Sequence, residues 1–222
     1  LGNVVAMVDP AFALSPEPLP RDDGTLQRLE GAERVIGVNL THLIAERAGG
    51  EGALAAEVGR WLGRVLDDPQ TRVVLIPHVA DRRSEVRGDA ALMRRLVTAA
   101  GLDAARAARV VFAGEDWRAG QYKTLVGRCD VLIAARTHLT IAGFSQGVPT
   151  ISLGYSQKAL GLNRDIYGSE RFHVAADGLS ADALQTALEA ALEAAATMSA
   201  QSLQYTRNGR ERNQAVLAEL SV

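Results

Sequence analysis

The sequence contains a single cysteine, Cys129, so no disulfide can form within the chain and no zinc site can be built from cysteines. A lone cysteine in an apolar stretch predicts a buried thiol in the reducing cytoplasm. No apolar run reaches the roughly 18 residues of a membrane-spanning helix, and no signal peptide is recognisable. The chain begins with Leu1 rather than Met, and we expect it to be part of a longer protein.

A strong excess of one charge is also missing. The net charge of the 222 residues is −2 and the isoelectric point is about 6.1, which gives no electrostatic reason to expect nucleic acid or an anionic membrane as partner. Lysine is rare, since only Lys123 and Lys158 occur. The composition, 47% apolar and 23% charged, is that of a globular protein large enough to bury a core.

Familiar nucleotide-binding and hydrolase motifs are absent as well. The first strand of the main domain is followed by Leu40-Thr41-His42 and not by a G-x-G-x-x-G loop. There is no Walker P-loop, no G-x-S-x-G elbow and no H-E-x-x-H motif. These absences exclude a standard dehydrogenase, NTPase, α/β hydrolase or zincin.

What the sequence does contain is an alternation of strand and helix patterns. We expect strands at 3–8, 34–39, 72–76, 109–112, 131–135, 150–153 and 172–175, and helices at 51–67, 90–100, 120–128, 138–145, 181–198 and 201–220, the last with a break near Gly209. Because most of these strands are apolar throughout, they predict a parallel sheet covered on both faces. The fold class is therefore α/β, with a Rossmann-like, doubly wound parallel sheet.

Proline, aspartate and glycine are concentrated between residues 9 and 24, which indicates a linker or surface loop. We therefore divide the chain into an interdomain segment at 1–32, a Rossmann-like domain at 33–178, and C-terminal helices at 179–222. The helices are expected to pack on this domain or to cross to another one.

Polar residues follow four of the predicted strands, at the edge of the sheet where ligands bind in open α/β folds. They lie at 39–42, 77–78, 136–138 and 155–158. Arg136 is the candidate for binding an anion, because a guanidinium grips carboxylate or phosphate through two N–H groups. The alternative is an ion pair with a structural carboxylate such as Asp130 or Glu115.

His138 begins a predicted helix, where an imidazole suits proton transfer and the helix start favours anions; the alternative is a histidine packed in the core. Lys158 could hold a phosphate or be an exposed surface lysine. For His78, contact with a ligand and a structural hydrogen bond are equally compatible with the sequence. His42 and His173 are interpreted as structural.

At these residues the chain resembles the polysaccharide pyruvyl transferase family. The matching pieces occur in the family's order and span nearly the whole chain: 8–11, 36–39, 75–79, 136–140, 147–151 and 155–158. The resemblance implies a two-domain protein of the GT-B type, of which this chain would be the C-terminal half. The N-terminal domain, which in the family supplies a further arginine, would be missing.

The resemblance also implies an activity, the transfer of pyruvate from phosphoenolpyruvate to a sugar with formation of a ketal. Arg136, His138 and Lys158 match the family's catalytic residues, and no metal or cofactor is implied. We expect substrate contacts from four further residues, Asn39, His78, Thr137 and Tyr155. The acceptor would be a glycan or lipid-linked sugar, handled in the cytoplasm or at the inner face of the membrane.

Two other functions stay open at this point. One is a GT-B glycosyltransferase that uses a nucleotide-sugar donor, although no clear glutamate follows a glycine-rich turn near 143–160. The other is a binding domain that keeps the fold without catalysis. The sequence leaves the acceptor sugar, its linkage and the oligomeric state undetermined.

Overall fold

The computed structural model describes residues 5–20, 24–79, 88–154 and 157–220. At its centre lies a six-stranded sheet with the order β3-β2-β1-β4-β5-β6. Every neighbouring pair is parallel. The strands are β1 (Arg34–Asn39), β2 (Thr71–Leu75), β3 (Val110–Phe112), β4 (Val131–Ala134), β5 (Thr150–Gly154) and β6 (His173–Ala175). This order is that of the doubly wound Rossmann fold, and it confirms the expected fold class.

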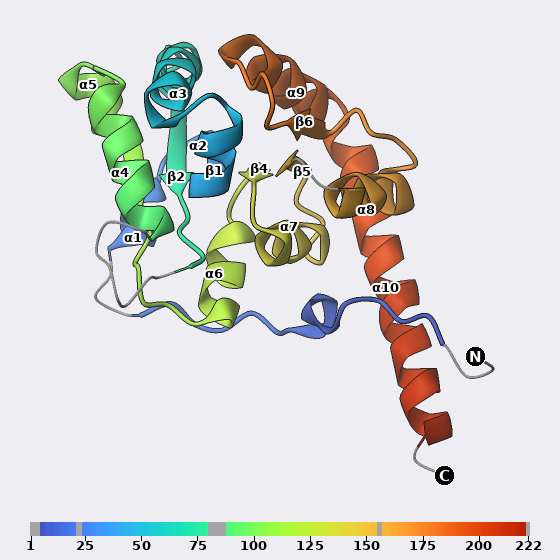
Figure 1. Cartoon of the computed structure of the whole chain (residues 1–222). Helices are drawn as coiled ribbons and strands as arrows, with labels where there is room; N and C mark the ends of the chain where they lie inside the picture. The colour runs from blue at the N-terminus through green and yellow to red at the C-terminus, as the bar shows by residue number, and fades with distance from the viewer. Residues whose placement is uncertain (1–4, 21–23, 80–87, 155–156, 221–222) are drawn as a thin grey trace.

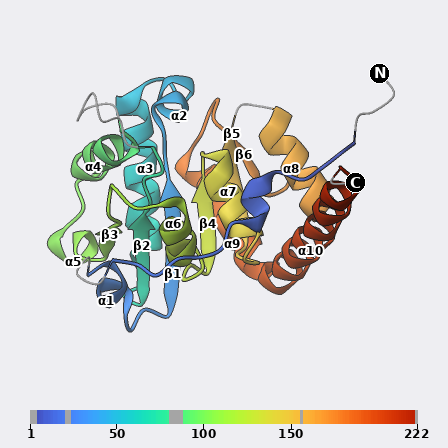
Figure 2. The same ribbon diagram turned by 90° about the horizontal axis from the view of Figure 1, so that it is seen from below.

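Helices cover both faces of the sheet (Figures 1 and 2). They are the 3-10 helix η1 (Pro10–Ala13), α1 (Thr25–Leu29), α2 (His42–Arg47), α3 (Glu51–Val65), α4 (Asp89–Ala99), α5 (Ala104–Ala107), α6 (Ala119–Val126), α7 (Thr137–Phe144), α8 (Gln157–Tyr167), α9 (Ala181–Glu193) and α10 (Ala195–Leu220). None of these helices is long and apolar enough to cross a membrane.

Two apolar clusters, one on each face, follow from the alternation of side chains along the strands. Ile36 and Ile133 belong to the cluster that α3, α4 and α9 cover, where Trp61 is almost fully buried. Leu132 belongs to the opposite cluster with α6 and α7. Cys129 is buried in that second cluster, and burial raises the pKa of its thiol, as expected for an inert structural cysteine.

The N-terminal residues differ from the expectation of a strand at 3–8. Residues 3 and 4 lie outside the described part, and residues 5–8 form no strand. Val8 instead exchanges two hydrogen bonds with the side chain of Asn213 in α10, each of 3.0 Å. The apolar run thus finds side-chain partners on a helix, and no neighbouring strand.

We call residues 5–18 the N-terminal strap. Phe12 of the strap is 1% exposed and its ring lies 5.5 Å from that of Tyr205. Arg210 donates to the Phe12 carbonyl over 3.0 and 2.6 Å, and Lys123 donates to the Leu14 carbonyl over 2.6 Å. The strap therefore runs along α6, α7 and α10 and is packed against them (Figure 1). The division at 1–32, 33–178 and 179–222 stays a prediction.

The two C-terminal helices start at Ala181 and end at Leu220 as expected, but the turn between them lies elsewhere. The chain turns at Ala194, and α10 then runs without a break through Gly209. Gly209 allows close packing, because a Cβ atom there would lie 2.7 Å from a methyl group of Val8. The glycine that suggested a break is the place where α10 meets the strap.

Candidate functional site

The expected ligand edge of the sheet is centred between β1 and β4. The chain leaves β1 toward β2 on one side and leaves β4 toward β5 on the other, so this is the topological switch point where ligands bind in such sheets. Asn39 ends β1 and Arg136 is the N-cap residue of α7, directly after β4. The Asn39 Oδ1 atom accepts the Arg136 backbone N–H over 3.1 Å, which joins the two strand ends.

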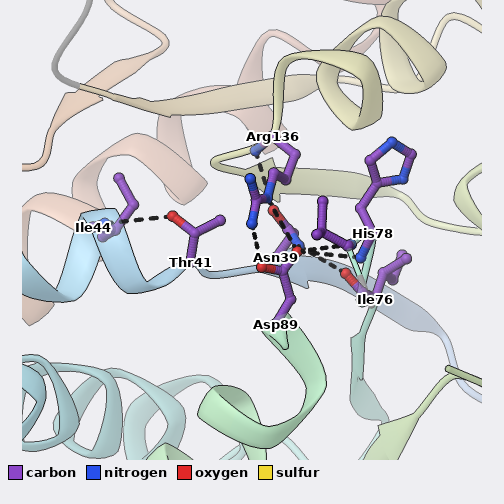
Figure 3. A network of polar contacts seen from close by, with 8 residues as sticks. Asn39, Thr41, Ile44, Ile76, His78, Asp89 and Arg136 are labelled. Atoms are coloured by element: carbon purple, nitrogen blue, oxygen red, sulfur yellow. Dashed lines mark hydrogen bonds and ion pairs between the residues drawn. The ribbon is translucent and has the colours of Figure 1, made fainter. Parts of the chain in front are cut away.

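Asp89, the first residue of α4, holds this junction together (Figure 3). The Arg136 guanidinium donates to both of its oxygens, from Nη2 over 2.7 Å and from Nε over 3.2 Å. The same carboxylate accepts the backbone N–H groups of His78 and Val79 over 3.3 and 3.1 Å, and the Asn39 amide over 3.4 Å. A fully buried carboxylate is stable here because it is paired and hydrogen-bonded.

This pairing bears on the two interpretations of Arg136. The structural carboxylates named for it have other partners, since Asp130 accepts the Val35 N–H over 2.7 Å and Glu115 pairs with Arg94 over 2.9 Å. Arg136 forms its ion pair with Asp89 instead. Its side chain stays 37% exposed, and none of its bonds to described residues uses Nη1.

Asp89 was missed by the sequence analysis. An acidic residue at a helix start is common because it complements the helix dipole, so the position alone carries no functional signal. Its burial and its partners arise only when the start of α4 meets the chain at the ends of β1, β2 and β4.

The two histidines of the edge face each other. The His138 side chain, in the first turn of α7, is 63% exposed, which excludes packing in the core. The His78 ring lies 6.4 Å from the His138 ring and 5.9 Å from the Tyr122 ring. Its Nδ1 atom is buried and has no hydrogen-bond partner among the described residues.

Burial lowers the pKa of His78, and the neighbouring His138 and Arg136 lower it further against the opposing effect of Asp89. The lowered pKa favours the neutral imidazole, which offers one N–H donor and one acceptor nitrogen.

For two further candidates the structure gives a position but, among the described residues, no hydrogen bond or ion pair with Arg136 or the two histidines of the edge. Lys158 lies in the first turn of α8, just past the carboxyl end of β5, and is exposed. Thr137 is half-buried at the start of α7 and lines a small pocket between α7 and α8 together with Ala159. Tyr155 lies outside the described residues.

Asn39 is fully buried, and both atoms of its amide are bonded within the protein. His42 and His173 lie apart from the cluster, and His173 is bonded to Ser152 over 3.0 Å. Within the described ranges, no three His, Cys, Asp or Glu side chains come together as a metal site would require.

Comparison with known proteins gives one family and one fold. The model of the family described as polysaccharide pyruvyl transferase matches residues 1–157. Among curated proteins, none shows significant sequence similarity to the chain.

Similar solved structures include the trehalose-6-phosphate synthase OtsA, with 12% identity and a TM-score of 0.54, where 95% of this chain covers 48% of the other. Another is the α,α-trehalose-6-phosphate synthase of Burkholderia multivorans, with 13% identity, a TM-score of 0.59, and 88% of this chain covering 44%. A third is the Escherichia coli ADP-heptose LPS heptosyltransferase II, with 11% identity, a TM-score of 0.53, and 80% covering 53%. These likenesses show the fold, that of GT-B glycosyltransferases, and the chain spans about half the length of each.

Proposed function

The chain belongs to the polysaccharide pyruvyl transferase family, and on this premise we propose that it carries the donor site for transfer of pyruvate from phosphoenolpyruvate to a sugar of a polysaccharide or other cell-surface glycan. The observation that carries the proposal is the position of Arg136-Thr137-His138 at the topological switch point, beside His78. In sheets of this kind the switch point is the ligand crevice.

The charges at this edge suit phosphoenolpyruvate, which carries a carboxylate and a phosphate. The Nη1 group of Arg136, the exposed Lys158 amine and the first backbone N–H groups of α7 are the available donors for these anions. Because Asp89 takes two donors of Arg136, we propose that this arginine offers one side of its guanidinium to the substrate. Asn39 then positions Arg136 and does not touch the substrate.

The chemical steps follow from the residue types. His138 as an imidazolium donates a proton to C3, the π electrons of the C2–C3 double bond form the new C–H bond, and a sugar hydroxyl bonds to the electrophilic C2. The proton of that hydroxyl returns to His138. The bond between C2 and the phosphate oxygen then breaks, and its electron pair leaves with the phosphate. A second sugar hydroxyl closes the ketal at C2 and gives its proton to the phosphate.

His78, a neutral imidazole 6.4 Å from the His138 ring, would assist as a hydrogen-bond partner of the substrate. We further propose that the acceptor surface lies largely on a second domain, because the chain spans about half the length of its GT-B neighbours. The reaction would take place in the cytoplasm on a glycan or a lipid-linked sugar.

The test begins with the donor, because the acceptor is unidentified. Calorimetry on the full-length protein should show binding of phosphoenolpyruvate and no comparable binding of UDP- or GDP-sugars. Binding of a nucleotide sugar alone would favour a glycosyltransferase. Binding of phosphoenolpyruvate without transfer to any glycan acceptor would favour a non-catalytic domain.

The role of His138 is tested by His138→Ala in the full-length protein. We expect turnover to fall by a factor on the order of 100 or more, the usual contribution of a general acid. His173→Ala is the matched control, because this histidine is bonded to Ser152 away from the cluster. Unchanged turnover in His138→Ala would remove this residue from the mechanism.

A further inference from the structure

Asp9 of the N-terminal strap lies beside His138. Its Oδ2 atom is 3.9 Å from the His138 Nε2 atom, and the Asp9 side chain is 29% exposed. The other oxygen, Oδ1, accepts the Ala11 backbone N–H over 3.0 Å and so caps the helix η1. One carboxylate oxygen is thus held by the backbone, and the other lies at ion-pair distance from the imidazole, beyond hydrogen-bond reach.

The position of Asp9 is fixed from both sides. Val8, the preceding residue, is bonded twice to Asn213. Phe12, three residues further on, is buried, and its carbonyl accepts two N–H groups of Arg210. The strap therefore presents the Asp9 carboxylate to the start of α7 as an anchored group, not as part of a loose linker.

Among the described residues, two further titratable side chains lie near His138, those of Arg136 and His78. Arg136 precedes it on the same chain segment, with Asp89 as its partner, and His78 faces it from the end of β2. Of the carboxylates in the described part of the chain, Asp9 is the one within ion-pair distance of the His138 imidazole. A carboxylate beside one ring nitrogen fixes the orientation of the imidazole.

We propose that Asp9 is a positioning residue for His138: it holds Nε2, so that Nδ1 faces the substrate and donates the proton to C3. This inference rests on the proposed function. In the proton step the Nδ1–H bond breaks and the C3–H bond forms, while Asp9 keeps its charge throughout. Three parts of the chain would then build the site: the strap, the loop after β2 and the start of α7.

Asp9→Asn tests the proposal without removing the cap, because asparagine keeps a side-chain oxygen for the Ala11 N–H and loses only the charge. We expect kcat for pyruvyl transfer to fall about fivefold, the size typical of an exposed ion pair, with the KM for phosphoenolpyruvate unchanged. The nitrogen-15 NMR signals of the His138 ring should also move, since the ring loses its charged neighbour.

Asp103→Asn is the matched control. Asp103 caps α5 in the same manner, accepting the Arg106 N–H over 2.8 Å, and α5 lies away from α7 in both views (Figures 1 and 2). This variant should leave kcat and the His138 signals in place. The NMR measurement needs no activity, so an absence of pyruvyl transfer in the unmutated protein would contradict the proposed function alone. His138 ring signals that stay in place in Asp9→Asn overturn the role of Asp9, whatever the turnover.

Discussion

The Asp89 carboxylate accepts hydrogen bonds from Arg136, from the chain after β2 and from Asn39. It is fully buried, and the two hydrogen bonds from Arg136 are charged. A buried carboxylate and its arginine stabilise the fold only as a pair, because either one left alone would be an uncompensated charge. The cost of losing one partner is therefore large.

Asp89→Asn should lower the free energy of unfolding by about 3 kcal/mol, as measured by denaturant titration. The new amide leaves the Arg136 charge without its partner and places N–H donors beside those of His78 and Val79. The direction of the change is a loss of stability.

Glu115→Gln is the control for this measurement. Arg94 donates to Glu115 from its Nε and Nη2 atoms, as Arg136 does to Asp89, but the Arg94 and Glu115 side chains are both about half exposed. Loss of this ion pair in Glu115→Gln should lower the free energy of unfolding by less than about 0.5 kcal/mol. Equal losses in the two variants would contradict the role assigned to burial at Asp89.

At the scale of single elements, the strands were the easiest part to predict. The apolar run at 34–39 coincides with β1, because a strand buried on both faces needs no alternation with polar residues. The short helices α1, α2 and α5 were not predicted, since one or two turns give no readable periodicity. The helix α8 was missed for another reason: it buries a polar residue, Asn163, which donates to Ser152 over 2.6 Å.

The candidate site was predicted in part for the same reason. Arg136, His138 and His78 follow strand ends, and the topology brings such positions together. The partners Asp89 and Asp9 begin a helix and cap a 3-10 helix, so their sequence positions indicate local structure only. Contacts that depend on packing between distant segments cannot be read from either pattern.

Gly209→Ala tests the contact between α10 and the strap. Alanine normally stabilises a helix relative to glycine by about 1 kcal/mol, but here the added methyl group would lie 2.7 Å from a Val8 side-chain atom. We expect a loss of about 1 kcal/mol in the free energy of unfolding, as is usual for overpacking.

Gly63→Ala gives the comparison, because Gly63 lies in α3 and a Cβ atom there meets nothing within 4 Å. This variant should gain up to about 1 kcal/mol from helix propensity. A gain of the same size in the free energy of unfolding of Gly209→Ala would contradict close packing between the strap and α10 at this residue.

At the scale of the whole molecule, the strap closes the structure over a buried lysine. Lys123 is 1% exposed and donates to the Leu14 carbonyl. Burial lowers its pKa to about 8, and the charge of Arg210 contributes to this shift. Between about pH 8 and the unfolded value of 10.5, the unfolded chain keeps a proton that the folded protein releases.

The contribution of Lys123 to the free energy of unfolding should therefore rise with pH, by up to about 1.4 kcal/mol per unit. The measurement is the difference in free energy of unfolding between the unmutated protein and Lys123→Met, followed from pH 7.5 to 9.5, a range that includes the folded pKa of Lys123. Cys129 and Tyr122, whose pKa values burial raises, contribute equally to both proteins. Lys158→Met, which changes an exposed lysine, should show the same dependence of unfolding free energy on pH as the unmutated protein. The same dependence in Lys123→Met would contradict the titration of a buried Lys123.

The strap also has a consequence for the order in which the protein is made. Val8 and its partner Asn213 are separated by 205 positions, so Val8 can form these contacts only after α10 has been synthesised. A nascent chain on the ribosome can pair β1 with β2 and then with β4 while the strap is still undocked. If Asp9 positions His138, this histidine gains its partner only when α10 has left the ribosomal tunnel and the strap has docked on it.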